Sequence, residues 1–256
     1  MGIAMAGLPS RSSGRKASAG CSEKVDRLAR WRDRWDSGQL GWHLDEVNPY
    51  LRRFLKELLR DTKAADWVNT MGPRLLVPLC GKTVDMAFLA AQGCRVVGVE
   101  GVPKAIQEFA KEHSLIGSTE AVDLPGEVDP GFCAHAMPVA GDGTCRPPPV
   151  LIIEGDFLAL TPAECEALIP FEAALDRGSL VALPPAERPA YVRILANMLK
   201  PGGRVLLVAV EHDAFSDGRL GPPFEVTEAD VRTLFGEKFG VELLLREDRF
   251  EHDEGM

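Results

Sequence analysis

The stretch that decides the fold is RLLVPLCGKTVDMAFLAAQGCRVVGVE, residues 74–100. An apolar run at 75–79 leads into a turn at Gly81, and a short helical segment follows. Glu100 then closes a second apolar run at 95–99. Apolar runs without polar alternation are typical of strands that are buried on both faces of a parallel sheet. The stretch therefore predicts a strand, a turn, a helix and a second strand beside the first.

This layout is typical of a nucleoside site at the carboxyl edge of a parallel sheet. A glycine in the first turn lets the backbone approach a ligand, and an acid at the end of the second strand can accept hydrogen bonds from both ribose hydroxyls. The turn lacks the spacing G-x-G-x-x-G that admits a pyrophosphate, which argues against a dinucleotide. A cofactor with a ribose and no phosphate fits better, and S-adenosylmethionine is the common one.

Helical and strand-like segments alternate along the rest of the chain, which predicts an α/β fold with a doubly wound, mostly parallel sheet. We expect one domain over residues 24–256. The expected helices cover 26–35, 49–60, 84–91, 103–113, 186–199 and 227–235, and the expected strands cover 74–79, 95–100, 150–153, 171–175, 204–210 and 241–245.

Two segments do not follow this pattern. Residues 116–149 contain many Gly, Pro and Asp residues with little periodicity, so we expect a loop or a hairpin insert there. Residues 1–23 are rich in Ala, Gly and Ser and basic before Glu23, which predicts a disordered tail, with a weak organellar presequence as the alternative.

Composition and charge limit the partners. The formal net charge of −9 argues against a nucleic-acid backbone or an anionic membrane as the main partner, and no apolar run reaches the roughly 18 residues of a membrane span. The 6 cysteines are scattered without a C-x-x-C pair, which indicates reduced thiols in the cytoplasm. No metal-binding motif is visible, and we expect a cytoplasmic monomer that acts on a small molecule.

Ligands of such sheets collect at the carboxyl ends of the strands, so the residues there are the candidates for a cofactor site. Glu100 is expected to hold the ribose. Asp156 is expected to accept a hydrogen bond from the adenine amino group, and Phe157 is expected to pack against the adenine ring. Leu79 and Gly81 are expected to supply backbone near the methionine portion.

A further pair, Asp176 and Arg177, follows the strand expected at 171–175, where the reactive end of the cofactor would point. Each candidate also has a structural interpretation. Asp156 can instead cap a helix, and Glu100 can be a solvated acid at a strand end. Asp176 and Arg177 can form a surface ion pair that stabilises the fold by less than about 1 kcal/mol. The coincidence across four strand ends favours a binding site.

Three of the 4 tryptophans, Trp31, Trp35 and Trp42, lie close together before the sheet begins. They can pack this segment onto the sheet, or they can cover the cofactor and form an aromatic slot for a flat substrate. The sequence leaves both interpretations open.

Several motifs occur together in an order that resembles the thiopurine S-methyltransferase family over about residues 29–250. The shared motifs are Trp31-x3-Trp35-x2-Gly38-x3-Trp42-His43, Pro78-Leu79-Cys80-Gly81-Lys82, Val96-Val97-Gly98-Val99-Glu100, Asp176-Arg177-Gly178-Ser179-Leu180-Val181-Ala182 and Gly221-Pro222-Pro223-Phe224.

The resemblance implies a class I methyltransferase fold and a set of residues that contact S-adenosylmethionine. These implied contacts are the Trp31–Trp42 segment, Leu79, Glu100, Gly155, Asp156 and Arg177. It also implies that Trp42 and Arg177 contact the substrate.

The implied reaction is methyl transfer from S-adenosylmethionine to the sulfur of an aromatic or heterocyclic thiol, with Arg177 favouring the thiolate and Asp176 orienting it. One alternative is a methyltransferase for another small acceptor, such as thiocyanate, halide, or a selenium or tellurium species. Another alternative is a weakly active or non-catalytic protein that binds S-adenosylmethionine.

The chain also departs from the family at its end. The family continues with a final antiparallel strand, whereas this chain is expected to stop after its strand at 241–245. We therefore expect the sheet to lack its last antiparallel strand, so that the strand at 204–210 has an open edge or pairs directly with the strand at 241–245. An open apolar edge favours association between copies.

Overall fold

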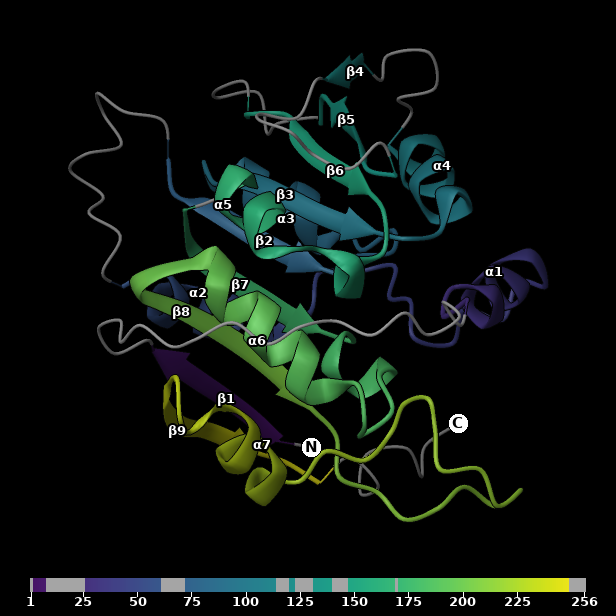
Figure 1. Cartoon of the computed structure of the whole chain (residues 1–256), viewed down its shortest axis with the longest axis vertical. Coiled ribbons are helices and arrows are strands. Elements are labelled where there is room, and N and C mark those ends of the chain that lie inside the picture. Colours follow the sequence, from purple (N-terminus) through teal and green to yellow (C-terminus); the bar gives the residue numbers. More distant parts are fainter. Residues whose placement is uncertain are drawn as a thin grey trace.

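The computed structural model describes residues 2–7, 26–60, 72–113, 120–122, 131–139, 147–168 and 170–248. A 9-stranded sheet passes through the protein in the order β4-β5-β6-β3-β2-β7-β8-β1-β9 (Figure 1). Its strands are β1 (Gly2–Gly7), β2 (Arg74–Pro78), β3 (Arg95–Glu100), β4 (Glu120–Val122), β5 (Cys133–Met137), β6 (Val150–Glu154), β7 (Phe171–Arg177), β8 (Leu199–Ala209) and β9 (Gly240–Arg246).

The centre of the sheet is parallel and confirms the predicted fold class. Strands β6, β3, β2, β7 and β8 pair in parallel with one another, and Leu76 of β2 lies opposite Val97 of β3. Both residues are buried, as continuous apolar runs in a sheet covered on both faces require. The strand pair that the stretch at 74–100 predicts is therefore present.

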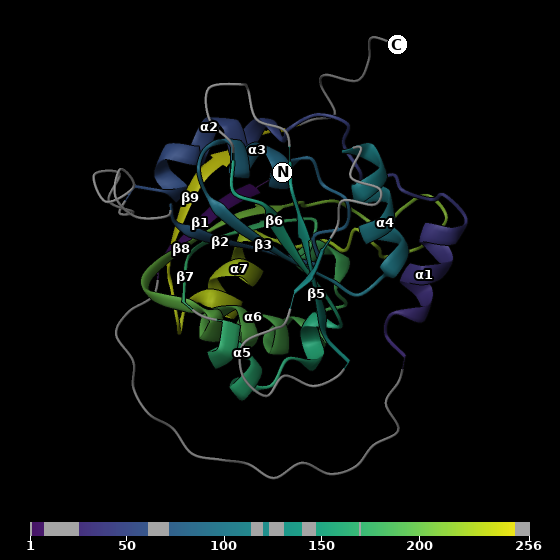
Figure 2. The same ribbon diagram turned by 90° about the horizontal axis from the view of Figure 1, so that it is seen from above.

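Helices cover both faces of the sheet, and Figure 2 shows α2 and α3 on one side and α5, α6 and α7 on the other. No helix in the described ranges has both the length and the apolar character needed to cross a membrane. The α-helices are α1 (Ala29–Asp36), α2 (Pro49–Leu58), α3 (Asp85–Ala91), α4 (Pro103–Glu112), α5 (Pro162–Leu168), α6 (Arg188–Met198) and α7 (Glu228–Phe235), with short 3₁₀ turns η2 (Phe157–Ala159) and η3 (Leu180–Ala182).

Helix α2 shows how the sequence pattern produces this layering. Its start is capped by Asn48, whose side chain accepts hydrogen bonds from the backbone N–H groups of Tyr50 and Leu51. Its buried residues include Leu51 and Leu58, which recur on one helical face and pack on the sheet. The apolar stripe predicted from the sequence thus faces the core.

The segment expected to be a loop or hairpin insert contains a hairpin that extends the sheet. Strand β5 pairs antiparallel with β6, and β4 pairs antiparallel with β5 at the edge. The parts of the insert at 114–119, 123–130 and 140–146 lie outside the described residues.

The expected open slot beside β8 is wrong, because the first residues of the chain fill it. Strand β1 lies between β8 and β9 and is antiparallel to both, with Ala4 opposite Leu207 on one side and Leu243 on the other. The expected tail is therefore a strand over Gly2–Gly7, and the rest of it lies outside the described residues. The physical reason is that the backbone groups at the edge of a buried strand need partners, and residues 2–7 contain neither charge nor proline.

Strand β1 should contribute measurably to stability. Replacing Ala4 with proline removes one backbone N–H from a strand that has partners on both sides, and an unmade buried hydrogen bond costs roughly 1–3 kcal/mol. We expect Ala4→Pro to lower the melting temperature by about 2–4 °C for each kcal/mol lost. The control Ala4→Gly keeps the N–H and should melt closer to the unaltered chain. Equal melting temperatures for Ala4→Pro and Ala4→Gly would contradict the pairing of β1.

Candidate active site

A pocket of about 350 Å³ opens at the carboxyl ends of the central strands. Figure 1 shows α1 beyond the arrowheads of β2 and β3, where it covers this edge of the sheet. Ten of the residues that the sequence pointed to line the pocket: Trp31, Trp35, Trp42, Leu79, Gly81, Glu100, Gly155, Asp156, Phe157 and Arg177. Strand ends that are distant in the sequence therefore meet at one site.

The turn after β2 brings backbone to the pocket wall. Leu79 has a φ of 43° and Gly81 a φ of 53°, so the chain reverses within three residues. The Cys80 N–H donates to the Val99 carbonyl at 3.0 Å and holds this turn against β3. A left-handed leucine is strained, and such strain persists where the surrounding structure holds it and is common at ligand sites.

Glu100 connects the two turns that follow β2 and β3. One carboxylate oxygen accepts from the Gly81 N–H at 2.8 Å, and the other accepts from the Val102 N–H at 2.7 Å. The side chain is buried, and this burial raises the pKa of Glu100 to about 7 despite backbone hydrogen bonds from Val102, Gly81 and Gly101. A carboxylate has about four acceptor sites, so Glu100 can still accept from a ribose hydroxyl.

The turn after β6 forms the next wall. Gly155 donates its N–H to the Glu100 carbonyl at 2.9 Å, and a Cβ at Gly155 would lie only 2.1 Å from the Phe132 ring. Only glycine fits at this position without a shift of Phe132. The turn is therefore held close to Glu100.

Asp156 has both of the roles that the sequence left open, because it lines the pocket and also caps η2. One carboxylate oxygen accepts from the Leu158 N–H at 2.9 Å, and the other pairs with Arg27 at 2.8 Å. The neighbouring Phe157 is buried against Tyr191, with ring centroids 5.3 Å apart. Arg27 is a partner that the sequence did not indicate.

The three tryptophans have both of the roles that the sequence left open, packing and lining the pocket. Trp42 packs edge-on against Trp31 and Trp35, with centroid distances of 5.4 and 6.1 Å, and all three line the pocket. The Arg34 guanidinium lies over the Trp42 ring at 4.9 Å from its centroid. The aromatic cluster thus packs the covering segment and forms one wall of the pocket.

Asp176 does not reach the pocket, so the catalytic role expected for it does not fit its position. Its side chain is fully buried and accepts from the Tyr191 hydroxyl at 2.7 Å and from the Leu180 N–H at 3.1 Å. Burial raises the pKa of Asp176 to about 6. Because successive residues of a strand face opposite sides, Arg177 faces the pocket while Asp176 holds η3 in place.

Sequence reasoning missed two basic side chains of the pocket, Arg34 and Arg219, whereas His43 and Lys82 stand in the motifs that it singled out. Besides Arg177, the lining includes Arg34, His43, Lys82 and Arg219. Burial lowers the pKa of Arg34, and the nearby positive charges of Arg30 and Arg219 add to that effect. Burial also lowers the pKa of His43, with Lys82 as the next cause. Arg34 lies between Trp31 and Trp35 of the tryptophan motif, and this position was the sequence feature that could have indicated it.

A pocket at the strand ends of a parallel sheet, with a buried carboxylate at the end of β3, agrees with the S-adenosylmethionine-dependent methyltransferases as a class of enzymes. The family model described as thiopurine S-methyltransferase matches residues 26–256. The chain belongs to the thiopurine S-methyltransferase family, and its cofactor is S-adenosylmethionine.

Three of the relatives named thiopurine S-methyltransferase show the degree of similarity. The protein of Pseudomonas aeruginosa (strain UCBPP-PA14) is 38% identical over 85% of this chain and 86% of its own length. The protein of Pseudomonas fluorescens (strain SBW25) is 37% identical over the same shares. The protein of Legionella pneumophila (strain Corby) is 34% identical over 86% of each chain.

We expect Glu100→Gln to weaken binding of S-adenosylhomocysteine by at least about tenfold, because a hydrogen bond to a charged group is worth roughly 1.5–3 kcal/mol. Calorimetric titration measures the affinity, and thermal melting shows whether the variant is folded. Asp176→Asn is the matched control, because it alters a buried carboxyl that does not line the pocket. Unchanged affinity in Glu100→Gln, or an equal loss in Asp176→Asn, would contradict this assignment.

The raised pKa of Glu100 also predicts a pH dependence. Ribose hydroxyls donate to the ionised carboxylate, whereas below a pKa of about 7 the free protein carries the protonated form. Binding then releases a proton, so the affinity for S-adenosylhomocysteine should fall about tenfold for each pH unit below 7. The Glu100→Gln variant should lose this dependence. A flat affinity profile between pH 8 and about 5.5 in the unaltered chain would contradict the ribose assignment.

Proposed function

We propose that this S-methyltransferase acts on a heteroaromatic thiol that reaches the pocket as an anion. The observation that carries the proposal is the pair Arg34 and Arg177 on a pocket whose aromatic wall suits a flat ring. Lys82 and Arg219 also line the pocket, where they pair with Glu112 and Asp217. Positive charge next to an apolar wall favours a thiolate or carboxylate on an aromatic substrate. The family name of the relatives agrees with a heterocyclic thiol.

The division of charge in the pocket supports separate roles for its residues. We assign Glu100, Gly81, Leu79 and the turn at Gly155 and Asp156 to the cofactor, and Trp42 and Arg177 to the acceptor. When bound, S-adenosylmethionine supplies an activated methyl group that passes to the acceptor sulfur as the bond to the sulfonium sulfur breaks.

Arg177 is the residue best placed to favour the thiolate form of the acceptor. It is more than half buried in the wall of the pocket, burial lowers its pKa, and the Asp85 carboxylate opposes this shift. A guanidinium stays protonated in proteins, so Arg177 keeps its positive charge. Since heteroaromatic thiols ionise more readily than a cysteine thiol, whose pKa is about 8.5, the site needs no strong base.

Orientation of the acceptor is the second contribution of the pocket. Trp31, Trp35 and Trp42 offer rigid faces and edges on one side, so a flat ring can bind in a limited set of orientations. Holding two reacting groups in line can lower a barrier by roughly 7–11 kcal/mol in favourable cases. This positioning is what we expect the aromatic wall to supply.

Small inorganic acceptors remain the second candidate. Thiocyanate, halide, or selenium and tellurium species also suit a basic pocket, but they make no use of the three tryptophans. We further propose that the protein acts as a monomer in the cytoplasm. The described cysteines, Cys80, Cys94, Cys133 and Cys165, are all free, which agrees with a reducing compartment.

A panel of acceptors tests the proposal. Methyl transfer should be fastest with heteroaromatic thiols, and Arg219→Gln should raise the Michaelis constant of a carboxylate-bearing thiol roughly three- to fivefold, as expected for an exposed ion pair. The same substitution should leave the constant of a neutral aromatic thiol nearly unchanged. Arg232→Gln is the control, because Arg232 pairs with Glu228 on α7 and does not line the pocket. Faster transfer to thiocyanate or halide than to every aromatic thiol would overturn the proposal.

A further inference from the structure

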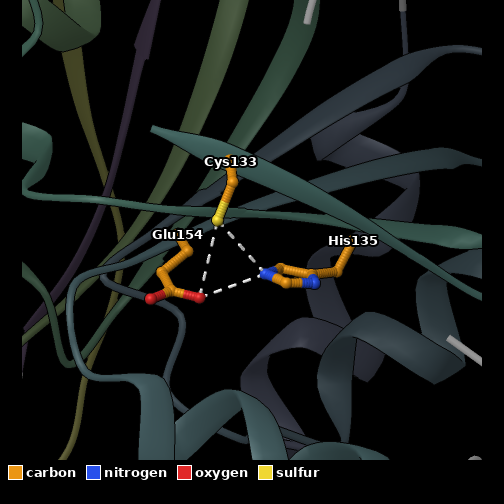
Figure 3. Close-up of side chains that lie close together, drawn as sticks. All are labelled: Cys133, His135 and Glu154. Carbon is orange, nitrogen blue, oxygen red and sulfur yellow. Dashed lines mark hydrogen bonds and ion pairs between the residues drawn. The ribbon is translucent and has the colours of Figure 1, made fainter. Parts of the chain in front are cut away.

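Three side chains with metal-binding atoms converge at the edge of the sheet next to the pocket wall. Figure 3 shows the Cys133 thiol, the His135 ring and the Glu154 carboxylate pointing toward one another. The Cys133 Sγ lies 3.5 Å from His135 Nε2 and 3.7 Å from Glu154 Oε2, and these last two atoms are 3.1 Å apart. Within the part of the chain that the structure describes, this is the group of His, Cys and acidic residues close enough to share an ion.

The antiparallel pairing of β5 and β6 brings the three side chains together. Cys133 and His135 are two residues apart on β5, so both face the same side of the sheet. Glu154 at the end of β6 is the register partner of Cys133. Directly opposed residues of an antiparallel pair have Cβ atoms roughly 4.5–5.5 Å apart, close enough for all three polar ends to meet.

We propose that Cys133, His135 and Glu154 bind a Zn²⁺ ion, with a water molecule as the fourth ligand. Bonds of about 2.3 Å to sulfur and about 2.0–2.1 Å to nitrogen and oxygen, at tetrahedral angles, place the ligand atoms about 3.3–3.6 Å apart. The three observed separations, 3.1, 3.5 and 3.7 Å, lie close to these values. An ion can therefore enter with shifts of a few tenths of an ångström.

The ligand types favour zinc. A thiolate and an imidazole are the ligands that zinc shares with other soft or borderline metals, and a carboxylate oxygen completes a common zinc set, whereas Mg²⁺ and Ca²⁺ require oxygen ligands. Cys133 is exposed, and His135 and Glu154 are half-buried, so an ion and a water can reach the site from solvent. A cation also offsets the repulsion between a thiolate and a carboxylate held this close.

The position of the cluster links it to the cofactor pocket. Glu154 immediately precedes Gly155 and Asp156 of the pocket wall, and Phe132, next to Cys133, packs against Gly155. A zinc ion would fasten strand β5 to β6 at this point. We therefore expect zinc to act structurally, by stabilising the strand end that holds the pocket wall.

The experiment uses the untagged full-length chain, freed of metal and kept reduced, and titrates it with Zn²⁺ in competition with a chromophoric chelator. We expect one Zn²⁺ per chain and a higher melting temperature with zinc. Cys133→Ser, His135→Gln and Glu154→Gln should each weaken binding by at least about tenfold, since even changes beyond the direct ligands cost about 10–100-fold in metal proteins. Titration with Co²⁺ adds a spectroscopic readout, a thiolate-to-cobalt absorption that Cys133→Ser should remove.

Two controls separate this site from other thiols and imidazoles. The double variant with Cys21→Ser and Cys145→Ser alters the cysteines outside the described residues, and His212→Gln alters a half-buried histidine that follows β8. Both should retain one tightly bound Zn²⁺. Absence of Zn²⁺ binding in the unaltered chain would overturn the proposal. So would binding that survives Cys133→Ser and is lost in the double variant. The readout does not depend on methyl transfer, so it stands apart from the proposed function.

Discussion

The Glu100 carboxylate is the group on which the pocket depends. Its two oxygens accept from the backbone N–H groups of Gly81 and Val102. The backbone carbonyl of Glu100 accepts from the Gly155 N–H, so the turns that follow three strands meet at this residue. Burial raises its pKa to about 7, which shows that the surroundings alone do not favour the ionised form. We expect hydroxyl donors from a ribose to add the stabilisation that this carboxylate lacks in the free protein. Cofactor binding and proton release are then expected to be linked at the same residue.

The rest of the pocket is divided by charge. The buried acid lies on the cofactor side, whereas Arg34, Arg177 and Arg219 bring positive charge to a wall that the tryptophans make apolar. Under the proposed function, this division lets one cavity bind a cationic sulfonium and an anionic acceptor without a dedicated base. It also accounts for Asp176, whose carboxyl is used within the core to hold η3 against Tyr191.

Both edges of the parallel sheet are extended by antiparallel strands, and each extension has its own physical basis. At one edge β1 supplies backbone partners to β8 and β9, which removes the exposed edge of an apolar strand. At the other edge the β4–β5 hairpin continues the sheet from β6 and places Cys133 and His135 beside Glu154. The first extension supports the core, and the second brings the proposed metal ligands next to the wall of the cofactor pocket.

The sequence by itself determined the strand–turn–helix–strand unit, the parallel sheet and the pocket residues at the strand ends, because apolar runs and the residues that follow them are local signals. It could not decide whether Asp176 or Arg177 faces the pocket, since adjacent strand residues face opposite sides and only packing selects between them. The tertiary structure alone placed Arg219 beside Arg34, β1 between β8 and β9, and Cys133 opposite Glu154. Each of these contacts joins residues far apart in the chain, where pairing and burial in the folded sheet decide the neighbour and no local pattern records it.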